Sequence, residues 1–268
     1  MHRLASLGNG EVAEFMTSLD RRGVLKGGLA GIAATAGASA CSDQSGRGSD
    51  GWDGDCVLSN EQTAGPYYLE DAPERSDITE GKPGSPVELS IRVVNVADCQ
   101  PVPEVAVEIW QCDAWGYYSG FVTADPGGEA PPVDEIGDPD TFLRGFNITD
   151  GEGLVQFTTI VPGWYAPRST HIHLKVHQGG RVDDGEYEGG DIVHTGQLYF
   201  ADDPIATIDK YEPYSSHVGQ RPWLDDDGIY SGAGQAEGLL EVTAHRPGAP
   251  MSGFDATIEL GIIIGNPG

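Results

Sequence analysis

The residues with the clearest chemical potential lie in one short run, 162–177, which reads PGWYAPRSTHIHLKVH. Two histidines, His171 and His173, are separated by a single residue. In an extended strand, residues two apart share a face and lie ~6.6 Å apart, so both imidazoles can reach one metal ion. His177 shares that face but lies ~13 Å beyond His173, and we exclude it from the site. The run therefore predicts a strand that presents two metal ligands, with hydrogen-bonded or solvated histidines as the alternative.

The loop before this strand supplies a different kind of donor. Tyr165 precedes His171 by six residues and Arg168 lies between them, whereas no Cys or carboxylate occurs in the loop. Histidine with tyrosine phenolate suits a hard, high-valent ion, and ferric iron is the natural candidate. A free phenol has a pKa of ~10, so only a strong Lewis acid keeps it ionised at neutral pH. Two phenolates and one hydroxide would balance three positive charges, which predicts a second tyrosine elsewhere.

Candidates for that tyrosine are Tyr117 and Tyr118, in the stretch 110–120, WQCDAWGYYSG. Strand alternation would point only one of two adjacent side chains at the metal. This stretch and four others resemble the intradiol ring-cleavage dioxygenases, of which protocatechuate and catechol dioxygenases are the best-known members. The other stretches are 142–145 (FLRG), 149–150 (TD), 162–177 and 197–200 (QLYF). Residues 63–68, TAGPYY, resemble the initial segment of that family.

The resemblance implies a β-sandwich that holds one non-haem Fe(III) per chain by two tyrosines and two histidines. Carried over by motif, the implied metal ligands are Tyr118, Tyr165, His171 and His173. The implied catalytic residues are Tyr165 and Arg168, and the implied substrate-binding residues are Gln197 and Tyr67. Tyr165 would be the axial ligand that leaves the metal and takes a proton from the substrate, and Arg168 would stabilise developing negative charge.

The implied reaction cleaves the ring of a catechol-type molecule between its two hydroxylated carbons, with O2, to a muconate-type diacid. Two alternatives belong to other classes: an exported β-sandwich that binds aromatics or sugars without catalysis, and a zinc hydrolase. The loop from Tyr165 to His171 is shorter than in the protocatechuate and catechol enzymes, and a helical N-terminal dimerisation segment is absent. The substrate and the oligomeric state, including a homodimer, therefore stay open.

The elements that must position these residues have the period of strands, with apolar residues alternating with polar ones after residue 85. The strands that we expect are 87–93, 105–110, 154–160, 170–177, 197–200, 239–244 and 256–264. Gly- and Asp-rich turns separate them, and no long helical period follows residue 42. The fold class is therefore all-β, an antiparallel β-sandwich with long active-site loops at 122–140 and 201–236.

The N-terminal 54 residues carry a different signal. Arg21 and Arg22 precede a weakly apolar stretch, 27–40, whose 14 residues are too few to span a bilayer. This pattern resembles a twin-arginine (Tat) signal peptide, which we place at 1–40. Cleavage before Cys41 and a lipid anchor on Cys41 both stay open. Residues 41–54 form a polar tether and 55–268 the β-sandwich domain, which places the mature protein outside the cell or anchored on the outer face of the membrane.

The amino-acid composition limits which molecules the protein can bind. The chain has 268 residues, with 42 acidic and 15 basic side chains and a formal net charge of −27. Nucleic acid is excluded because its binding needs a basic surface, and docking on an anionic membrane is disfavoured. An acidic, lysine-poor surface favours a halophilic protein, whose self-repulsion salt would screen. Beyond Cys41, three cysteines allow three disulfide pairings, which the sequence leaves open: Cys56, Cys99 and Cys112.

Overall fold

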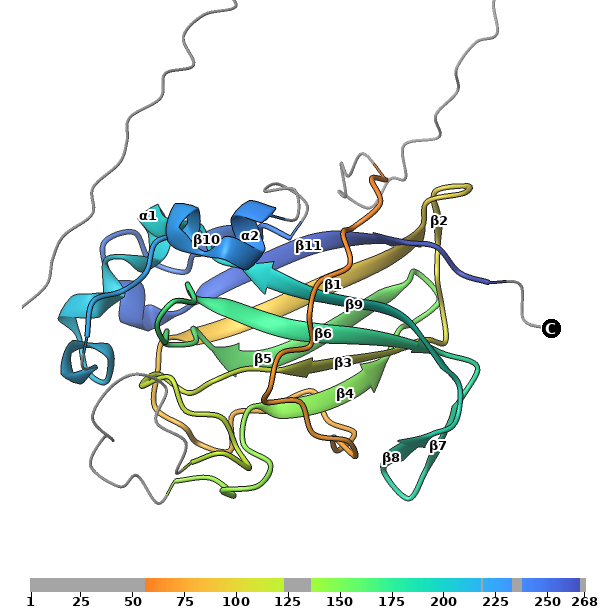
Figure 1. The fold of residues 1–268 in the computed structure, drawn as a ribbon, viewed down its shortest axis with the longest axis horizontal. Coiled ribbons are helices and arrows are strands. Elements are labelled where there is room, and N and C mark those ends of the chain that lie inside the picture. The colour runs from red at the N-terminus through yellow and green to blue at the C-terminus, as the bar shows by residue number, and fades with distance from the viewer. Residues whose placement is uncertain (1–55, 123–135, 218, 233–237, 266–268) are drawn as a thin grey trace, which may run out of the picture. The chain divides into compact units, whose positions relative to one another are not determined.

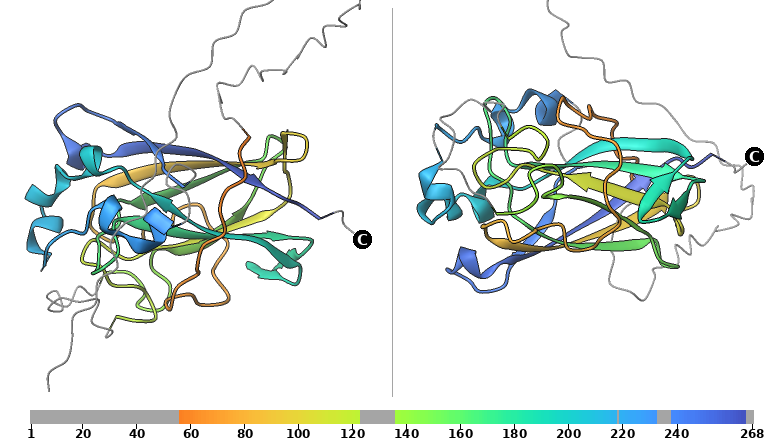
Figure 2. Two further views of the ribbon diagram at one scale, coloured as in Figure 1. Left: turned by 45° about the horizontal axis from the view of Figure 1, so that its top comes forward. Right: turned by 90° about the horizontal axis from the view of Figure 1, so that it is seen from below.

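Two stacked β-sheets form the core of the protein, as the sequence predicts. The computed structural model describes residues 56–122, 136–217, 219–232 and 238–265. The larger sheet has the order β10 (Glu241–Ala244), β11 (Phe254–Ile262), β1 (Pro86–Asn95), β2 (Gln100–Pro101), with β5 (Leu154–Ile160) also paired to β1. The smaller has the order β4 (Arg144–Ile148), β3 (Ala106–Trp110), β6 (His171–Gln178), β9 (Asp191–Tyr199). Figures 1 and 2 show their strands running along the same long axis.

The predicted alternation explains why the sheets stack. In β1, every second residue is buried: Val87, Leu89, Ile91 and Val93. The apolar face of β6 joins the same core cluster through Ile172, Leu174 and Val176. The histidines of β6 therefore point away from the core, onto the outer face of the smaller sheet.

Among the described residues, the paired strands are antiparallel, as the sequence predicts, with the exception of one pair. β1 pairs β11 in parallel, from Val87 opposite Phe254 to Asn95 opposite Ile262. A parallel pair needs a long crossover, and nearly the whole domain lies between these two strands in the sequence. The prediction also missed three elements in addition to β2: β4, and the hairpin of β7 (Arg181–Asp183) and β8 (Glu186–Glu188).

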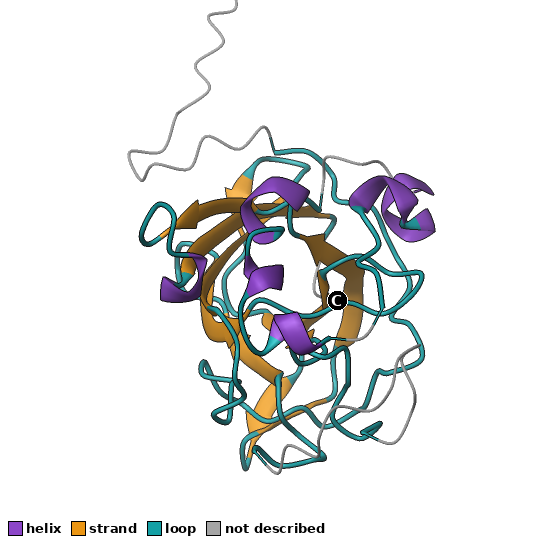
Figure 3. Ribbon diagram, turned by 90° about the vertical axis from the view of Figure 1, so that its left-hand side faces the viewer, coloured by secondary structure: helices purple, strands orange, loops and turns teal. Residues whose placement is uncertain are grey.

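The stretch 201–236 is not a plain loop in its described part. It contains α1 (Asp202–Ile205), α2 (Gly228–Gly232) and three 3-10 turns at Ile208–Lys210, Tyr214–Ser216 and Leu224–Asp226. A fourth 3-10 turn, Pro250–Ser252, precedes β11. Figure 3 shows helices and loops gathered over one end of the sheets, and Figure 1 places the β7–β8 hairpin at the opposite end. Most of the other predicted loop, 122–140, lies outside the described residues.

A segment that we call the strap, residues 58–78, crosses the outer face of the smaller sheet (Figure 1). It is hydrogen-bonded to β9 where Gln62 donates its backbone N–H to the carbonyl of Thr195 (2.8 Å). It reaches β4 where Arg75 donates to the carbonyl of Phe146 (2.9 Å). The strap therefore covers the face on which the histidines lie.

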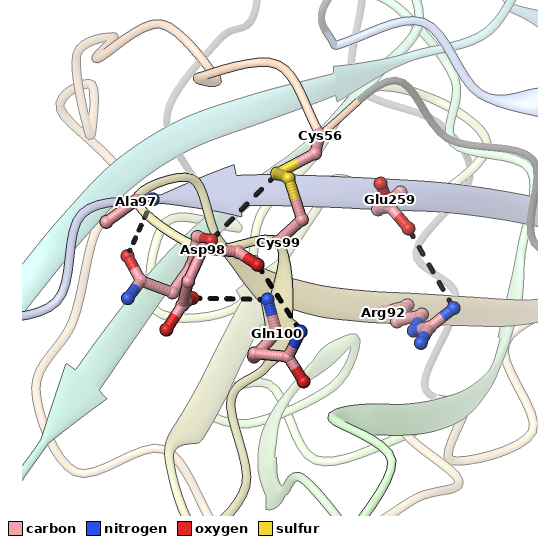
Figure 4. The surroundings of a disulfide bond; sticks show 8 residues. Cys56, Arg92, Ala97, Asp98, Cys99, Gln100 and Glu259 are labelled. Atoms are coloured by element: carbon pink, nitrogen blue, oxygen red, sulfur yellow. Dashed lines mark hydrogen bonds and ion pairs between the residues drawn. A yellow bond between two sulfur atoms is a disulfide. The ribbon is translucent and has the colours of Figure 1, made fainter. Parts of the chain in front are cut away.

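One of the three open disulfide pairings is present. Cys56 is bonded to Cys99, which ties the start of the described chain to the turn between β1 and β2 (Figure 4). Cys112 is a free, buried thiol. The predicted signal peptide and tether lie outside the described residues. None of the helices described is long and apolar enough to cross a membrane.

Candidate metal centre

The two histidines of β6 converge on one point. Their Nε2 atoms lie 3.1 Å apart, and each residue is only 1% exposed. Nδ1 of His171 lies 2.6 Å from the carbonyl oxygen of Ser169. Because a carbonyl only accepts, Nδ1 must carry the proton, and the lone pair of Nε2 is left for a ligand or metal. A strand with this register thus presents a ready pair of imidazole donors.

Both predicted tyrosine ligands reach the same point from loops. The hydroxyl oxygens of Tyr118 and Tyr165 each lie 3.5 Å from Nε2 of His171. Tyr118 comes from the turns after β3, and Tyr165 from the loop between β5 and β6. Of the two adjacent tyrosines, it is Tyr118 whose hydroxyl lies beside the histidines. The fold therefore brings together two imidazoles and two phenols from three parts of the chain, a cluster that we call the His/Tyr centre.

Burial makes this centre electrically neutral on its own. It raises the pKa of Tyr118 well above its ordinary value and that of Tyr165 to about 12. It lowers the pKa of His171 to about 3 and that of His173 well below its ordinary value. At neutral pH the four donors are thus two phenols and two neutral imidazoles. A multivalent cation would supply the missing positive charge and favour the phenolates.

The donor types indicate which cation fits. Within the residues that the structure describes, no three His, Cys, Asp or Glu side chains come together to hold a metal ion. A metal in the His/Tyr centre therefore depends on the tyrosines. Zinc favours His, Cys and carboxylate donors, whereas phenolate with imidazole suits ferric iron. The residues present fit Fe(III).

Sheet register sets the neighbours of the histidines. One row across the smaller sheet runs from Arg144 through Trp110 and His173 to Gln197. The indole of Trp110 stacks on the ring of His173, with centroids 5.0 Å apart and planes 5° apart. Strand pairing alone therefore places Gln197, a predicted substrate-binding residue, beside a metal-ligand candidate.

Tyr67 of the strap covers the tyrosines. Its ring stacks on Tyr118 at 4.6 Å and contacts Tyr165 edge-on at 5.8 Å. The strap can approach because Gly65, with φ of 71°, has no side chain: a Cβ there would lie 3.3 Å from Cε1 of His173. The guanidinium of Arg144 donates to the carbonyl of Tyr67 (2.7 Å), which ties the strap to β4. Tyr67 thus forms a wall of the centre.

A buried ion pair shapes the turn that carries Tyr118. Oδ1 of Asp113 accepts hydrogen bonds from the backbone N–H groups of Trp115 and Tyr117, both at 3.0 Å. Oδ2 accepts from Nζ of Lys82 at 3.2 Å, and both side chains are 4% exposed. Sequence reasoning missed this pair, since the partners are 31 residues apart and neither belongs to a metal-binding pattern.

Arg168 is held on two sides. Nη2 donates to Oε1 of Gln197, whose own Nε2 donates to the carbonyl of Thr63 in the strap (2.8 Å). Nε of Arg168 donates to Oδ2 of Asp227 at 2.9 Å. Asp227 was also missed by sequence reasoning, because it follows two similar aspartates in a stretch interpreted as a loop.

The excluded histidine lies apart from these groups. Nε2 of His177 is 2.9 Å from Oε2 of Glu108, so His177 has a carboxylate partner of its own. Glu108 also accepts a hydrogen bond from the hydroxyl of Tyr68 at 3.3 Å.

Known proteins that are similar to this chain are dioxygenases. A family model described as dioxygenase matches residues 63–215, more than half of the chain. Hydroxyquinol 1,2-dioxygenase of Rhodococcus opacus is 42% identical over 181 residues, which cover 59% of this chain and 58% of the relative. The protocatechuate 3,4-dioxygenase beta chain of Burkholderia cepacia is 34% identical over 117 residues, 41% of this chain and 43% of the relative. The matched region thus spans about half the length of these curated relatives.

A solved structure extends the likeness to the whole fold. The intradiol ring-cleavage dioxygenase from Tetranychus urticae superposes with a TM-score of 0.64 at 29% identity. The match covers 78% of this chain and 95% of that chain. The chain therefore belongs to the dioxygenase family, and its resemblance to the intradiol ring-cleavage enzymes is confirmed.

Proposed function

We propose that this protein is an Fe(III) dioxygenase that cleaves the ring of a catechol-type aromatic between its two hydroxylated carbons. One observation carries the proposal: in a chain of the dioxygenase family, two phenol oxygens and the Nε2 atom of His173 lie within 3.5 Å of Nε2 of His171. Tyr118, Tyr165, His171 and His173 would hold the iron. Bound there, Fe(III) would act as a Lewis acid that stabilises the deprotonated catechol and orients it for attack by O2.

Tyr165 has the better position to act as the base. It lies in a loop and is 8% exposed, whereas Tyr118 is 1% exposed and is covered by the stacked ring of Tyr67. As a phenolate, Tyr165 accepts one proton from a catechol hydroxyl. Burial raises the pKa of Tyr165 to about 12 in the absence of a cation, which supports its role as an acceptor of that proton.

Arg168 supplies a positive charge that acts on this base. Its guanidinium is fixed by Asp227 and Gln197, and its charge acts to lower the pKa of Tyr165 against the larger, opposing effect of burial. In a site from which Tyr67 and Trp110 exclude water, Arg168 stabilises the negative charge that develops on the substrate. Gln197 is paired with His173 in the sheet, which supports a role for it beside the substrate.

The test is a purified, full-length protein with measured metal content, colour and product. We expect one iron per chain, a visible tyrosinate-to-iron charge-transfer band, and uptake of one O2 per catechol to give a diacid that contains both oxygen atoms of that O2. With isotopically labelled O2, both new oxygen atoms of the product should therefore carry the label. Stoichiometric zinc in colourless protein would favour the hydrolase, and aromatic binding without O2 uptake would favour the binding module; either result would overturn the proposal.

The substrate class is proposed from the same centre. The relatives are named for hydroxyquinol and protocatechuate, which share two adjacent hydroxyl groups with catechol. A panel of catechol, hydroxyquinol, protocatechuate and chlorinated catechols, compared by kcat/KM, should give turnover with at least one member. No turnover with any of them would contradict ring cleavage of simple catechols.

We also propose that the protein is exported by the Tat route. The twin arginines, Arg21 and Arg22, support this, as does the disulfide between Cys56 and Cys99, because disulfides persist in oxidising compartments. Replacing both arginines with lysine should leave precursor in the cytoplasm. Unchanged export would remove the proposal, and mass spectrometry of the mature N-terminus would distinguish cleavage from a lipid on Cys41.

A further inference from the structure

A buried carboxylate from a distant segment touches the loop that carries the base and the arginine. Asp227 is the third of three consecutive aspartates. Asp225 and Asp226 are exposed, whereas the side chain of Asp227 is fully buried. The segment that contains it begins more than 20 residues after β9 ends, so its contact with the loop from Tyr165 to His171 is a tertiary one.

Both oxygens of Asp227 are fully used. Oδ2 accepts from the backbone N–H of Ser169 (3.0 Å), from Oγ of Ser169 (3.1 Å) and from Nε of Arg168 (2.9 Å). Oδ1 accepts from Nε of Arg168 (3.1 Å) and from the backbone N–H groups of Ile229 (2.9 Å) and Tyr230 (3.4 Å). Each oxygen therefore faces a backbone donor, and only a carboxylate can satisfy both sides.

Burial alone would raise the pKa of Asp227, but the charge of Arg168 and these hydrogen bonds outweigh it and lower the pKa. The carboxylate is thus ionised at neutral pH and forms a buried ion pair. A buried carboxylate with hydrogen bonds on both oxygens cannot shift without leaving donors unsatisfied. Asp227 is therefore a rigid anchor.

The anchor holds two consecutive residues of the active-site loop. Arg168 has a long side chain with many rotamers, and Nε fixes the guanidinium plane while Nη2 contacts Gln197 and Tyr199. Ser169, the second residue held, accepts Nδ1–H of His171 on its carbonyl. Arg168 is thus constrained from the side of Asp227 and from the side of β9.

We propose that Asp227 is a positioning residue for ring cleavage, which fixes the guanidinium of Arg168 beside the His/Tyr centre. This inference rests on the proposed function. A guanidinium that stabilises transition-state charge is effective only if it is already in place when the charge develops. Loss of the anchor should therefore lower kcat rather than weaken substrate binding.

The test is Asp227→Asn in the iron-loaded, full-length protein, with Asp226→Asn as the matched control. An asparagine must turn its NH2 group toward a backbone N–H on one side, so the anchor loosens. We expect kcat to fall by ~10²-fold, as for loss of one preorganised donor, with KM changed less than about threefold. Iron content and the visible band should stay as in the wild type. Asp226→Asn should retain wild-type kcat, because its side chain is exposed.

A double-mutant cycle separates positioning from general stabilisation. If Asp227 acts through Arg168, Asp227→Asn should have no further effect on kcat in an Arg168→Ala background. Equal losses in both backgrounds would show that Asp227 does not act through Arg168 and would overturn the proposal. Wild-type kcat in Asp227→Asn would overturn it as well.

A second variant keeps the proposal testable if Asp227→Asn fails to fold. Ser169→Ala removes one donor to Asp227 and leaves the carboxylate and backbone in place. It should lower kcat several-fold, and this loss should also vanish in the Arg168→Ala background. If Ser169→Ala lowered kcat equally in the Arg168→Ala background, or did not lower kcat in the wild type, the positioning role of Asp227 would be contradicted. A wild-type protein that binds iron but cleaves no catechol would refute the proposed function instead.

Discussion

The disulfide between Cys56 and Cys99 should be a major source of stability, and its removal can be predicted in magnitude. The two cysteines are separated by 43 residues in the sequence. A crosslink lowers the conformational entropy of the unfolded chain in proportion to the logarithm of the loop that it closes. For this separation the chain-entropy relation gives about 4 kcal/mol at 25 °C, a large share of the 5–15 kcal/mol typical of a domain.

The perturbation is the double variant Cys56→Ser/Cys99→Ser, compared with the wild type in urea at pH 7. We expect the free energy of unfolding to fall by about 2–4 kcal/mol, since residual structure in the unfolded chain reduces the ideal value. Wild type unfolded in the presence of dithiothreitol is the matched control and should coincide with the double variant. Ring cleavage should be unaffected at urea concentrations below the unfolding transition. The disulfide lies next to β2, and β2 is at the opposite end of the sheets from α1 and the loops around it (Figure 1).

A loss below about 1 kcal/mol would refute the reasoning, because the crosslink would then constrain little of the unfolded chain. The reasoning would also be refuted if dithiothreitol lowered the free energy of unfolding of the double variant as much as that of the wild type. In that case the reagent would act on something other than this disulfide.

Four further predictions concern the centre and the charges around it. Lys82→Met should lower the free energy of unfolding in urea by about 3–5 kcal/mol, because Asp113 is left buried without its cation; a loss under 1 kcal/mol would contradict this. Tyr165→Phe should keep iron and a weaker, shifted visible band, while turnover falls by ~10²–10⁴-fold. Tyr118→Phe should instead change the visible spectrum of the complex with catechol. If neither variant changed the spectrum, the assignment of the two tyrosines as metal ligands would be wrong. Burial lowers the pKa of His194, so the native state resists protonation of this residue and the free energy of unfolding should fall as the pH drops below ~6.5. His194→Gln should make the free energy of unfolding depend less steeply on pH between pH 7 and 5. An unchanged pH dependence in this variant would contradict the prediction. The melting temperature should rise from low to molar salt because of the net charge of −27, and a salt-independent value would reject the halophilic interpretation.

Strand periodicity and motif order were enough to predict most of the sandwich and the members of its centre. The face of β6 that carries His171 and His173 follows from alternation alone, since the apolar residues between them must enter the core. The proximity of Tyr118 and Tyr165 came from the family resemblance, because nothing local in the sequence states where two loops meet.

The elements that were missed lack a local signal. β4 reads Arg-Gly-Phe-Asn-Ile, which has little alternation, and the β7–β8 hairpin is short and largely exposed. The parallel pairing of β1 with β11 depends on the path of the whole domain. Asp227 and Lys82 find their partners 59 and 31 residues away, so their roles depend on tertiary contacts that composition and spacing do not encode.

The two faces of β6 make the proposed metal site and the hydrophobic core depend on the same alternation of residues. Because side chains alternate with a period of two, deleting or inserting one residue between His171 and Val176 would exchange the faces of part of the strand. Imidazoles would then enter the hydrophobic interior, and Ile172 or Leu174 would take the place of a ligand. Natural variation in this strand should therefore consist of substitutions and be free of single-residue insertions and deletions, while length changes accumulate in the β7–β8 hairpin that follows it.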